Sequence, residues 1–148
     1  MSSGTLTMSG GVLKGNTAAS DGVGGVVINT GKFEVSGNPV ISDNLADEAV
    51  NNVALREGLF ITVTGPLSDA NIGIIYPLNG QFGTFTYSPT PEQAAVHAAC
   101  FTPDEGSLLA VIKENKLYWP AAKINGTNYV TVQDAVTAAA SAPGQTIT

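Results

Sequence analysis

The stretch Thr5-Leu6-Thr7-Met8-Ser9-Gly10 recurs twice, as Lys32-Phe33-Glu34-Val35-Ser36-Gly37 and as Phe60-Ile61-Thr62-Val63-Thr64-Gly65. Leu6 and Phe33 are 27 residues apart, and Phe33 and Ile61 are 28 apart. From its second residue each copy reads apolar, polar, apolar, hydroxyl, glycine. Period-two alternation that ends at glycine is typical of a short strand with one buried face and a tight corner. The repeat predicts three stacked strands with Leu6, Phe33 and Ile61 in one buried column.

Two further pairs of segments repeat at the same spacing. Gly15-Asn16-Thr17-Ala18 aligns with Asp43-Asn44-Leu45-Ala46, and Val26-Val27-Ile28 aligns with Val53-Ala54-Leu55. Each unit is therefore expected to hold three strands. Such a unit cannot bury its own apolar face, whereas stacked units bury a continuous column. The predicted fold is mainly β: a short parallel β-helix of about three coils over residues 1–76, with rungs about 4.8 Å apart.

Polar residues repeat at the corners between these strands. Asn16 is expected to lie over Asn44, and Ser9 over Ser36 over Thr64, because these positions share the strand register. Polar side chains stacked in this way can hydrogen-bond to their copies one rung away. An ordinary turn preference explains the asparagines equally well when they are taken alone. The coincidence with the strand register favours structural ladders.

Residues 77–119 lack the repeat and are predicted to cap the open end of the β-helix, where strand edges and core need cover. Pro91 to Cys100 indicates a short helix with proline in its first turn. Two strands, 108–113 and 116–119, follow and are joined by Glu114-Asn115 as a tight hairpin. The cap is therefore expected to be α+β.

Residues 120–148 are predicted to begin a following module, with a hairpin and then an alanine-rich helix. The apolar stripe of this helix comprises Val132, Ala135, Val136 and Ala139. We expect the stripe to dock on the cap near Tyr118 and Trp119, which offer the largest nearby apolar surface. The last stretch, 144–148, is expected to start a new strand.

Two segments carry a resemblance to a known class of proteins. They read GTLTMSGGVLKGNTA and GVGGVVINTGKFEVSGNPVISDN. Residues 4 to about 118 resemble the glycine-rich repeats of large surface-anchored β-helix proteins from gut Firmicutes, and more distantly adhesin passenger domains. The resemblance implies a right-handed, pectin lyase-like parallel β-helix in an extracellular protein of the bacterial cell surface. Ala49-Val50-Asn51-Asn52 departs from the pattern and predicts an irregular corner there.

Composition limits the possible partners. Only 12% of the residues are charged, against roughly 25% in an average soluble domain. The net charge of −6, without any lysine or arginine cluster, argues against nucleic-acid binding. Apolar runs stay short of the roughly 20 residues that a membrane span requires. Surface glycans or neighbouring modules of the same protein are the expected partners.

One possible catalytic pair is visible. His97 and Cys100 are three residues apart on the expected helix and could be neighbours. Their context, Ala-Val-His-Ala-Ala-Cys-Phe, is that of packed side chains. We expect a structural role for both residues.

The acidic residues are the other candidates for chemistry. Asp43, Asp47, Glu48 and Glu57 could form an acidic patch, but they fall at expected corners and loops, where solvated acids are common. The calcium repeat Gly-Gly-x-Gly-x-Asp does not occur. No cofactor or metal is expected.

Three functions remain to be weighed. The repeat and the uncharged surface favour a non-catalytic structural or adhesive module, serving as a spacer or as a contact to glycans or host surfaces. The alternative is a fragment of a β-helix polysaccharide lyase or glycosidase, which rests only on how often that fold carries such activity. Ice binding would need a threonine ladder, but Thr5 and Thr7 align with Lys32 and Glu34.

Overall fold

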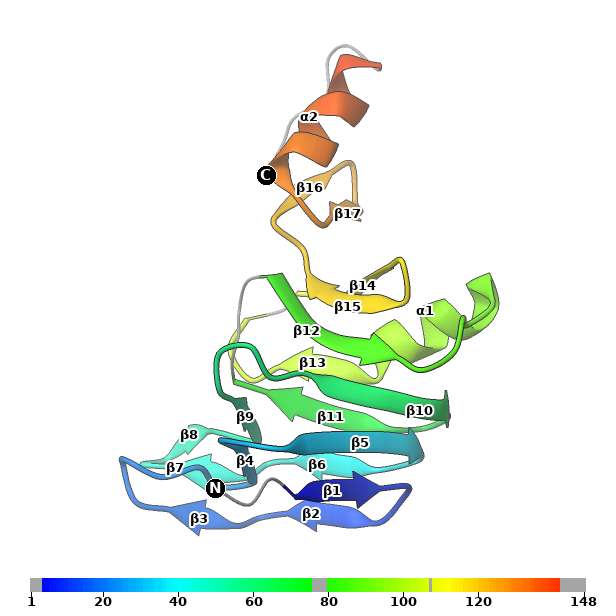
Figure 1. The fold of residues 1–148 in the computed structure, drawn as a ribbon. Helices are drawn as coiled ribbons and strands as arrows, with labels where there is room; N and C mark the ends of the chain where they lie inside the picture. Colours follow the sequence, from blue (N-terminus) through cyan, green and yellow to red (C-terminus); the bar gives the residue numbers. More distant parts are fainter. Residues whose placement is uncertain (1–3, 76–79, 107, 142–148) are drawn as a thin grey trace.

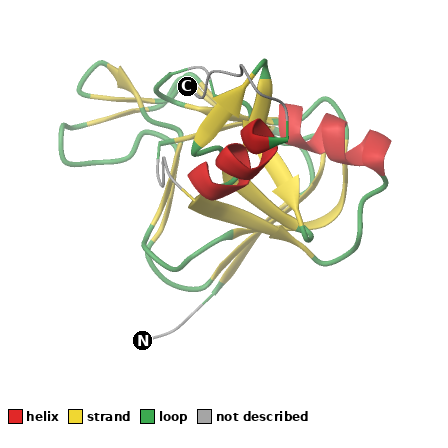
Figure 2. Ribbon diagram, turned by 90° about the horizontal axis from the view of Figure 1, so that it is seen from above, coloured by secondary structure: helices red, strands yellow, loops and turns green. Residues whose placement is uncertain are grey.

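The chain winds into a β-solenoid of about three turns (Figure 1). The computed structural model describes residues 4–75, 80–106 and 108–141. Viewed from above, the strands wrap around a common interior (Figure 2), and Figure 1 shows one helix at the side of the stack and the other beyond its end. The mainly β fold predicted from the repeat is confirmed.

One face of the solenoid is a six-stranded sheet. Its strands, in spatial order, are β1 (Thr5–Met8), β5 (Lys32–Gly37), β10 (Ile61–Leu67), β12 (Gly80–Phe85), β15 (Lys116–Trp119) and β14 (Val111–Lys113). The first four strands are parallel, and Leu6 and Ile61 both pair with Phe33. The register predicted from the 27- and 28-residue spacings is confirmed.

The second face is a parallel sheet of four short strands. They are, in spatial order, β13 (Phe101–Pro103), β11 (Asn71–Ile74), β6 (Val40–Ser42) and β2 (Val12–Lys14). The first coil thus holds four strands where the sequence predicted three. The strand β2 pairs with β6 at the same 28-residue spacing, Val12 with Val40 and Leu13 with Ile41, so this repeat was present in the sequence but was missed.

The remaining side of the solenoid carries short strand pairs. They are β3 (Thr17–Ala18) with β7 (Leu45–Ala46) and β8 (Ala49–Val50), and β4 (Val26–Ile28) with β9 (Val53–Leu55). The strand β3 pairs in parallel with β7, and β4 pairs in parallel with β9, both in the predicted registers. The strand β8 turns back antiparallel on β7. This hairpin is the irregular corner that the departure from the repeat predicted.

The buried column forms only where rungs lie on both sides of it. Phe33 and Ile61 are fully buried, but Leu6 is 45% exposed, so its predicted burial is wrong. Leu6 lies on β1, which is an edge strand of its sheet in the described part of the chain. A side chain in the first rung therefore has a neighbour on one side only.

Parallel stacking continues beyond the end of the sequence repeat. The strand β12 pairs in parallel with β10, and β13 pairs in parallel with β11. Between them the chain inserts α1 (Pro91–Ala99), which begins with a capping box formed by Thr90 and Gln93. The predicted helix is confirmed, and its insertion explains why the periodicity is lost while the solenoid goes on.

An antiparallel hairpin ends the parallel stack. The strand β15 pairs antiparallel with β12 on one side and with β14 on the other. Glu114 and Asn115 have φ of 51° and 59°, as a two-residue hairpin turn of left-handed residues requires. The predicted hairpin is confirmed.

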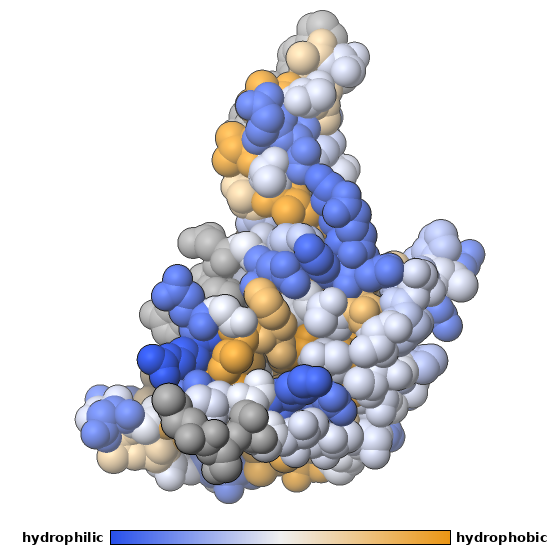
Figure 3. All heavy atoms as spheres, viewed as in Figure 1, coloured by the Kyte–Doolittle hydropathy of each residue, from blue (hydrophilic) through white to orange (hydrophobic). Residues whose placement is uncertain are grey.

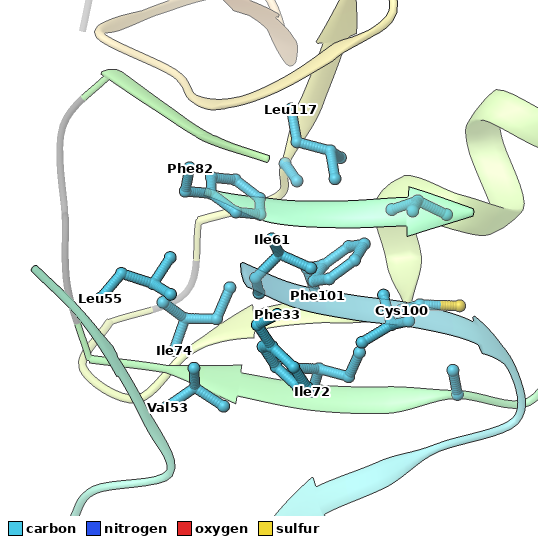
Figure 4. Close-up of a cluster of buried hydrophobic side chains, with 14 of the residues drawn as sticks. Phe33, Val53, Leu55, Ile61, Ile72, Ile74, Phe82, Cys100, Phe101 and Leu117 are labelled. Carbon is cyan, nitrogen blue, oxygen red and sulfur yellow. The ribbon is translucent and has the colours of Figure 1, made fainter. Parts of the chain in front are cut away.

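Aromatic side chains fill the core beneath this hairpin. Phe82 stacks on Trp119 at 4.4 Å between ring centroids and meets Phe101 edge to face at 5.5 Å. Figure 4 shows Phe82 and Leu117 above Ile61 and Phe33, with Phe101 beside Ile61, so the buried column continues upward. One core therefore joins the repeat and the cap.

The trailing segment has a small core of its own. It consists of β16 (Ala122–Ile124), β17 (Thr127–Tyr129) and α2 (Val132–Ala140). Ala135 is fully buried against Ala122 and Ile124. Docking of the helix near Tyr118 and Trp119 is therefore wrong, because the preceding hairpin supplies a nearer apolar surface.

Part of the predicted helix stripe stays uncovered. Val132 and Val136 are 54% and 43% exposed, and apolar atoms are visible over this end of the molecule in Figure 3. Lys113 Nζ contacts Asp134 Oδ2 at 3.2 Å and joins the helix to the cap. The strand expected over 144–148 lies outside the described residues.

Candidate functional site

The segments that follow β2, β6, β8 and β13 bring together a line of hydrogen-bonded polar side chains. It consists of Asn16, Asn44, Asn52 and Asp104, and is called the polar column below. Asn16 Nδ2 donates to Asn44 Oδ1 at 2.8 Å, and Asn44 Nδ2 donates to Asn52 Oδ1 at 2.9 Å. Asn52 Nδ2 donates to Asp104 Oδ1 at 2.6 Å. The two asparagines aligned in the sequence are therefore in direct contact.

Backbone groups fix the orientation of the Asn44 and Asn52 side-chain amides. The Asn16 backbone N–H donates to Asn44 Oδ1 at 3.2 Å, and the Asn44 backbone N–H donates to Asn52 Oδ1 at 3.0 Å. Asn44 Nδ2 also donates to the carbonyl oxygens of Leu13 and Ser42. Asn44 is completely buried, so these bonds replace water around its amide. All three asparagines donate in the same direction along the stack.

The polar column ends on a carboxylate. In its ionised form a carboxylate accepts hydrogen bonds and donates none. Asp104 takes the Asn52 side chain on Oδ1 and the Asn52 backbone N–H on Oδ2, the latter at 2.6 Å. Burial raises the pKa of Asp104 above its ordinary value, and the hydrogen bonds from Asn52 act in the opposite direction. An acceptor-only group suits the end of a chain of donors.

Asn52 and Asp104 were not found from the sequence. The β7–β8 hairpin, with Asp47 and Glu48 at φ of 49° and 66°, returns the chain so that Asn52 meets Asn44 eight residues earlier. Asp104 falls outside the repeat because α1 is inserted before it. The departure of Ala49-Val50-Asn51-Asn52 from the repeat was the sequence signal that the chain follows a different path near Asn52.

The second expected ladder does not form. Met8, Val35 and Val63 pair in register, but the register between β5 and β10 shifts after Val63, so the alignment is not kept from Ser36 to Thr64. Among the described residues no hydrogen bond joins these three side chains. Thr64 Oγ1 instead donates to the Val35 carbonyl oxygen at 3.3 Å. Ser9 and Thr64 are exposed, so water competes for their hydroxyls.

The polar column leaves no room for a side chain at Gly73. A Cβ built on Gly73 would collide with Asn52 Nδ2 and Asp104 Oδ1. We expect Gly73→Ala to lower the free energy of unfolding by about 2 kcal/mol through loss of that buried hydrogen bond. Urea unfolding measures the change. Gly65→Ala is the control, since among the described residues its Cβ would meet only Ser36 Cβ, at an ordinary 3.4 Å. Equal losses at both sites would contradict the prediction.

His97 and Cys100 are each bonded to other groups. His97 Nε2 lies 2.8 Å from the Tyr87 hydroxyl, and the imidazole stacks on Phe85 at 5.7 Å between centroids. The Cys100 thiol donates to the Val96 carbonyl oxygen at 3.2 Å. Burial lowers the pKa of His97 and raises the pKa of the Cys100 thiol, so both neutral forms are favoured. These environments suit packing rather than nucleophilic chemistry.

Acid should destabilise the protein through His97. Its pKa in the folded state lies below the ordinary value of about 6.5, so the neutral ring favours folding. This contribution is complete above pH 6.5 and is lost as the pH falls below it. We expect the melting temperature to drop between pH 7 and pH 5.5, and the drop to be smaller in His97→Phe. Equal pH dependence in both proteins would exclude His97 as the cause.

The acidic residues do not form a cluster. Asp43 pairs with Lys14 at 2.9 Å, and the hydrogen bond to Lys14 lowers the pKa of Asp43. Asp47 and Glu48 form the exposed β7–β8 turn, and Glu57 is exposed between β9 and β10. Within residues 4–75, 80–106 and 108–141, no group of three or more histidine, cysteine, aspartate or glutamate side chains could hold a metal ion.

An open groove of about 450 Å³ separates the cap from the trailing hairpin. Its walls include Leu108 and Leu109, which are 40% and 64% exposed, and Pro120. Asn128 closes one side and donates from Nδ2 to the Leu109 carbonyl oxygen at 3.2 Å. The groove can receive apolar groups.

No family model, curated protein or solved structure matches this chain. Among the described residues, no helix is long and apolar enough to cross a membrane.

Proposed function

We propose that the chain is a non-catalytic structural module of a secreted bacterial cell-surface protein, in which it serves as a rigid spacer. The polar column carries this proposal. Asn44, Asn52 and Asp104 place their polar atoms against neighbouring rungs, where each bond stabilises the stack. In a binding or catalytic cleft, such groups would instead be free to meet a ligand.

The surface chemistry supports the same proposal. Only 12% of the chain is charged, and Figure 3 shows large areas of intermediate hydropathy on the visible face of the solenoid. Like charges at the same position of successive rungs would repel each other. An uncharged polar surface therefore suits a stack that has to extend without strain.

The extracellular location is proposed on the resemblance of the repeat to surface-anchored β-helix proteins. Cys100, the only cysteine, is buried with a thiol of raised pKa. A buried neutral thiol reacts slowly with oxidants, which is compatible with an oxidising environment. Contact with surface glycans is the adhesive form of the same proposal.

A combined glycan-array and polysaccharide-depolymerisation screen tests the proposal on the full chain. A spacer gives no turnover and no glycan binding, and binding without turnover assigns the adhesive form. His97→Ala and Cys100→Ala are expected to leave the binding profile unchanged, since both side chains are buried. Turnover of any polysaccharide that is lost in an Asp47→Asn, Glu48→Gln and Glu57→Gln triple variant would overturn the proposal.

A further inference from the structure

The two ends of the solenoid are finished differently. At one end the antiparallel strands β15 and β14 close the six-stranded sheet. At the other end β1, β2, β3 and β4, the strands of the first coil, each pair with one strand only among the described residues, and β1, β2 and β3 are the lowest strands in Figure 1. Three apolar side chains of this rung are exposed: Leu6 by 45%, Val12 by 69% and Val27 by 50%. This rung is called the open end below.

Gly4 at the open end and Gly31 one coil later occupy the same position of the repeat, but only Gly31 is crowded by a described neighbour. Gly31 precedes β5, and a Cβ on it would collide with the carbonyl oxygen of Gly4 in the rung below. Gly4 holds the equivalent register position, one residue before Thr5, which pairs with Lys32. Among the described residues, which begin at Gly4 itself, no atom lies within 4 Å of a Cβ built on Gly4. A carbonyl of one more rung would occupy that space.

The first member of the polar column, Asn16, lies at this end and is exposed. Asn16 donates from Nδ2 toward Asn44, as Asn44 does toward Asn52. Asn44 Oδ1 and Asn52 Oδ1 each accept a hydrogen bond from the preceding member of the polar column. Asn16 Oδ1 accepts no such hydrogen bond from the described residues. A further rung stacked in the same sense would supply that donor from an amide of its own.

We propose that the open end is a docking surface for one further coil of the same repeat, stacked in parallel register. The coil places an apolar residue over Leu6, a carbonyl oxygen over Gly4 and an amide donor at Asn16. A second copy of this chain fits less well. At its other end the six-stranded sheet finishes in the antiparallel strands β15 and β14, which blocks parallel stacking on that sheet, so two copies would meet open end to open end with antiparallel strands.

The test inserts a second copy of residues 5–31 between Gly4 and Thr5 of the full chain. The copy keeps the 27-residue spacing and places its own glycine before Thr5. A matched control carries the same residues in scrambled order. Hydrogen exchange of the original Thr5–Met8 amides and urea unfolding are measured on both proteins and on the unmodified chain.

With the ordered insert, exchange at the original Thr5–Met8 amides should slow by at least about tenfold, and the urea midpoint should rise in one cooperative transition. The scrambled insert should change neither. Equal exchange with both inserts, or separate unfolding of the ordered insert, would overturn the proposal. A dimer of the unmodified chain that Leu6→Asp dissociates would assign the open end to a second copy and would overturn it as well.

Discussion

Phe33→Asp is expected to abolish cooperative folding. Phe33 is fully buried between Leu6 and Ile61 in the stacked register, so an aspartate there would be a charge without a partner in the core. The expected loss is about 5 kcal/mol or more, comparable with the whole stability of a small domain. Circular dichroism and urea unfolding should show no cooperative transition.

The same column supplies a matched control. Leu6→Asp introduces the same charge one rung away, at a position that is 45% exposed. Its cost should stay below about 1 kcal/mol because water reaches the carboxylate. Because Phe33→Asp is expected not to fold, Phe33→Ala provides a measurable value. We expect it to lower the free energy of unfolding by about 3 to 5 kcal/mol. Similar losses for the Phe33 and Leu6 variants would mean that the stack does not form as described.

Asn44→Ala should produce the largest loss of any polar substitution in the described part of the chain. The Asn44 side chain is completely buried and bonds to neighbours on three segments. Its removal leaves the Leu13 and Ser42 carbonyl oxygens without the donor that Asn44 provides. We expect a loss of about 3 kcal/mol in the free energy of unfolding, measured in urea.

Asn16→Ala is the control for this substitution. Asn16 makes the same type of side-chain bond, to Asn44 Oδ1, but it is exposed at the open end. Its loss should stay below about 1 kcal/mol because water can replace the amide. An equal cost at the two positions would show that stacking, rather than burial, sets the energy of the polar column.

The sequence by itself determined the register of the stack. Parallel rungs place equivalent residues one above another, so the spacing from Leu6 to Phe33 and from Asn16 to Asn44 could be read directly. The helix and the hairpin of the cap also followed from local signals. Thr90 with proline next to it starts α1, and Glu114-Asn115 provides the turn. Each of these features depends on residues close in sequence or on a fixed period.

Only the tertiary structure decided which groups are covered. Leu6 stands in the same sequence pattern as Phe33, yet it is exposed. Its strand β1 has a neighbouring strand on one side only in the described part of the chain, and the local pattern does not show this. Asn52 and Asp104 join the polar column through a reversed hairpin and an inserted helix, neither of which keeps the repeat spacing. The helix α2 packs through Ala135 on the hairpin formed by β16 and β17, because this hairpin offers the closest apolar surface. Burial depends on neighbours that are distant in sequence, and periodicity specifies only those one coil away.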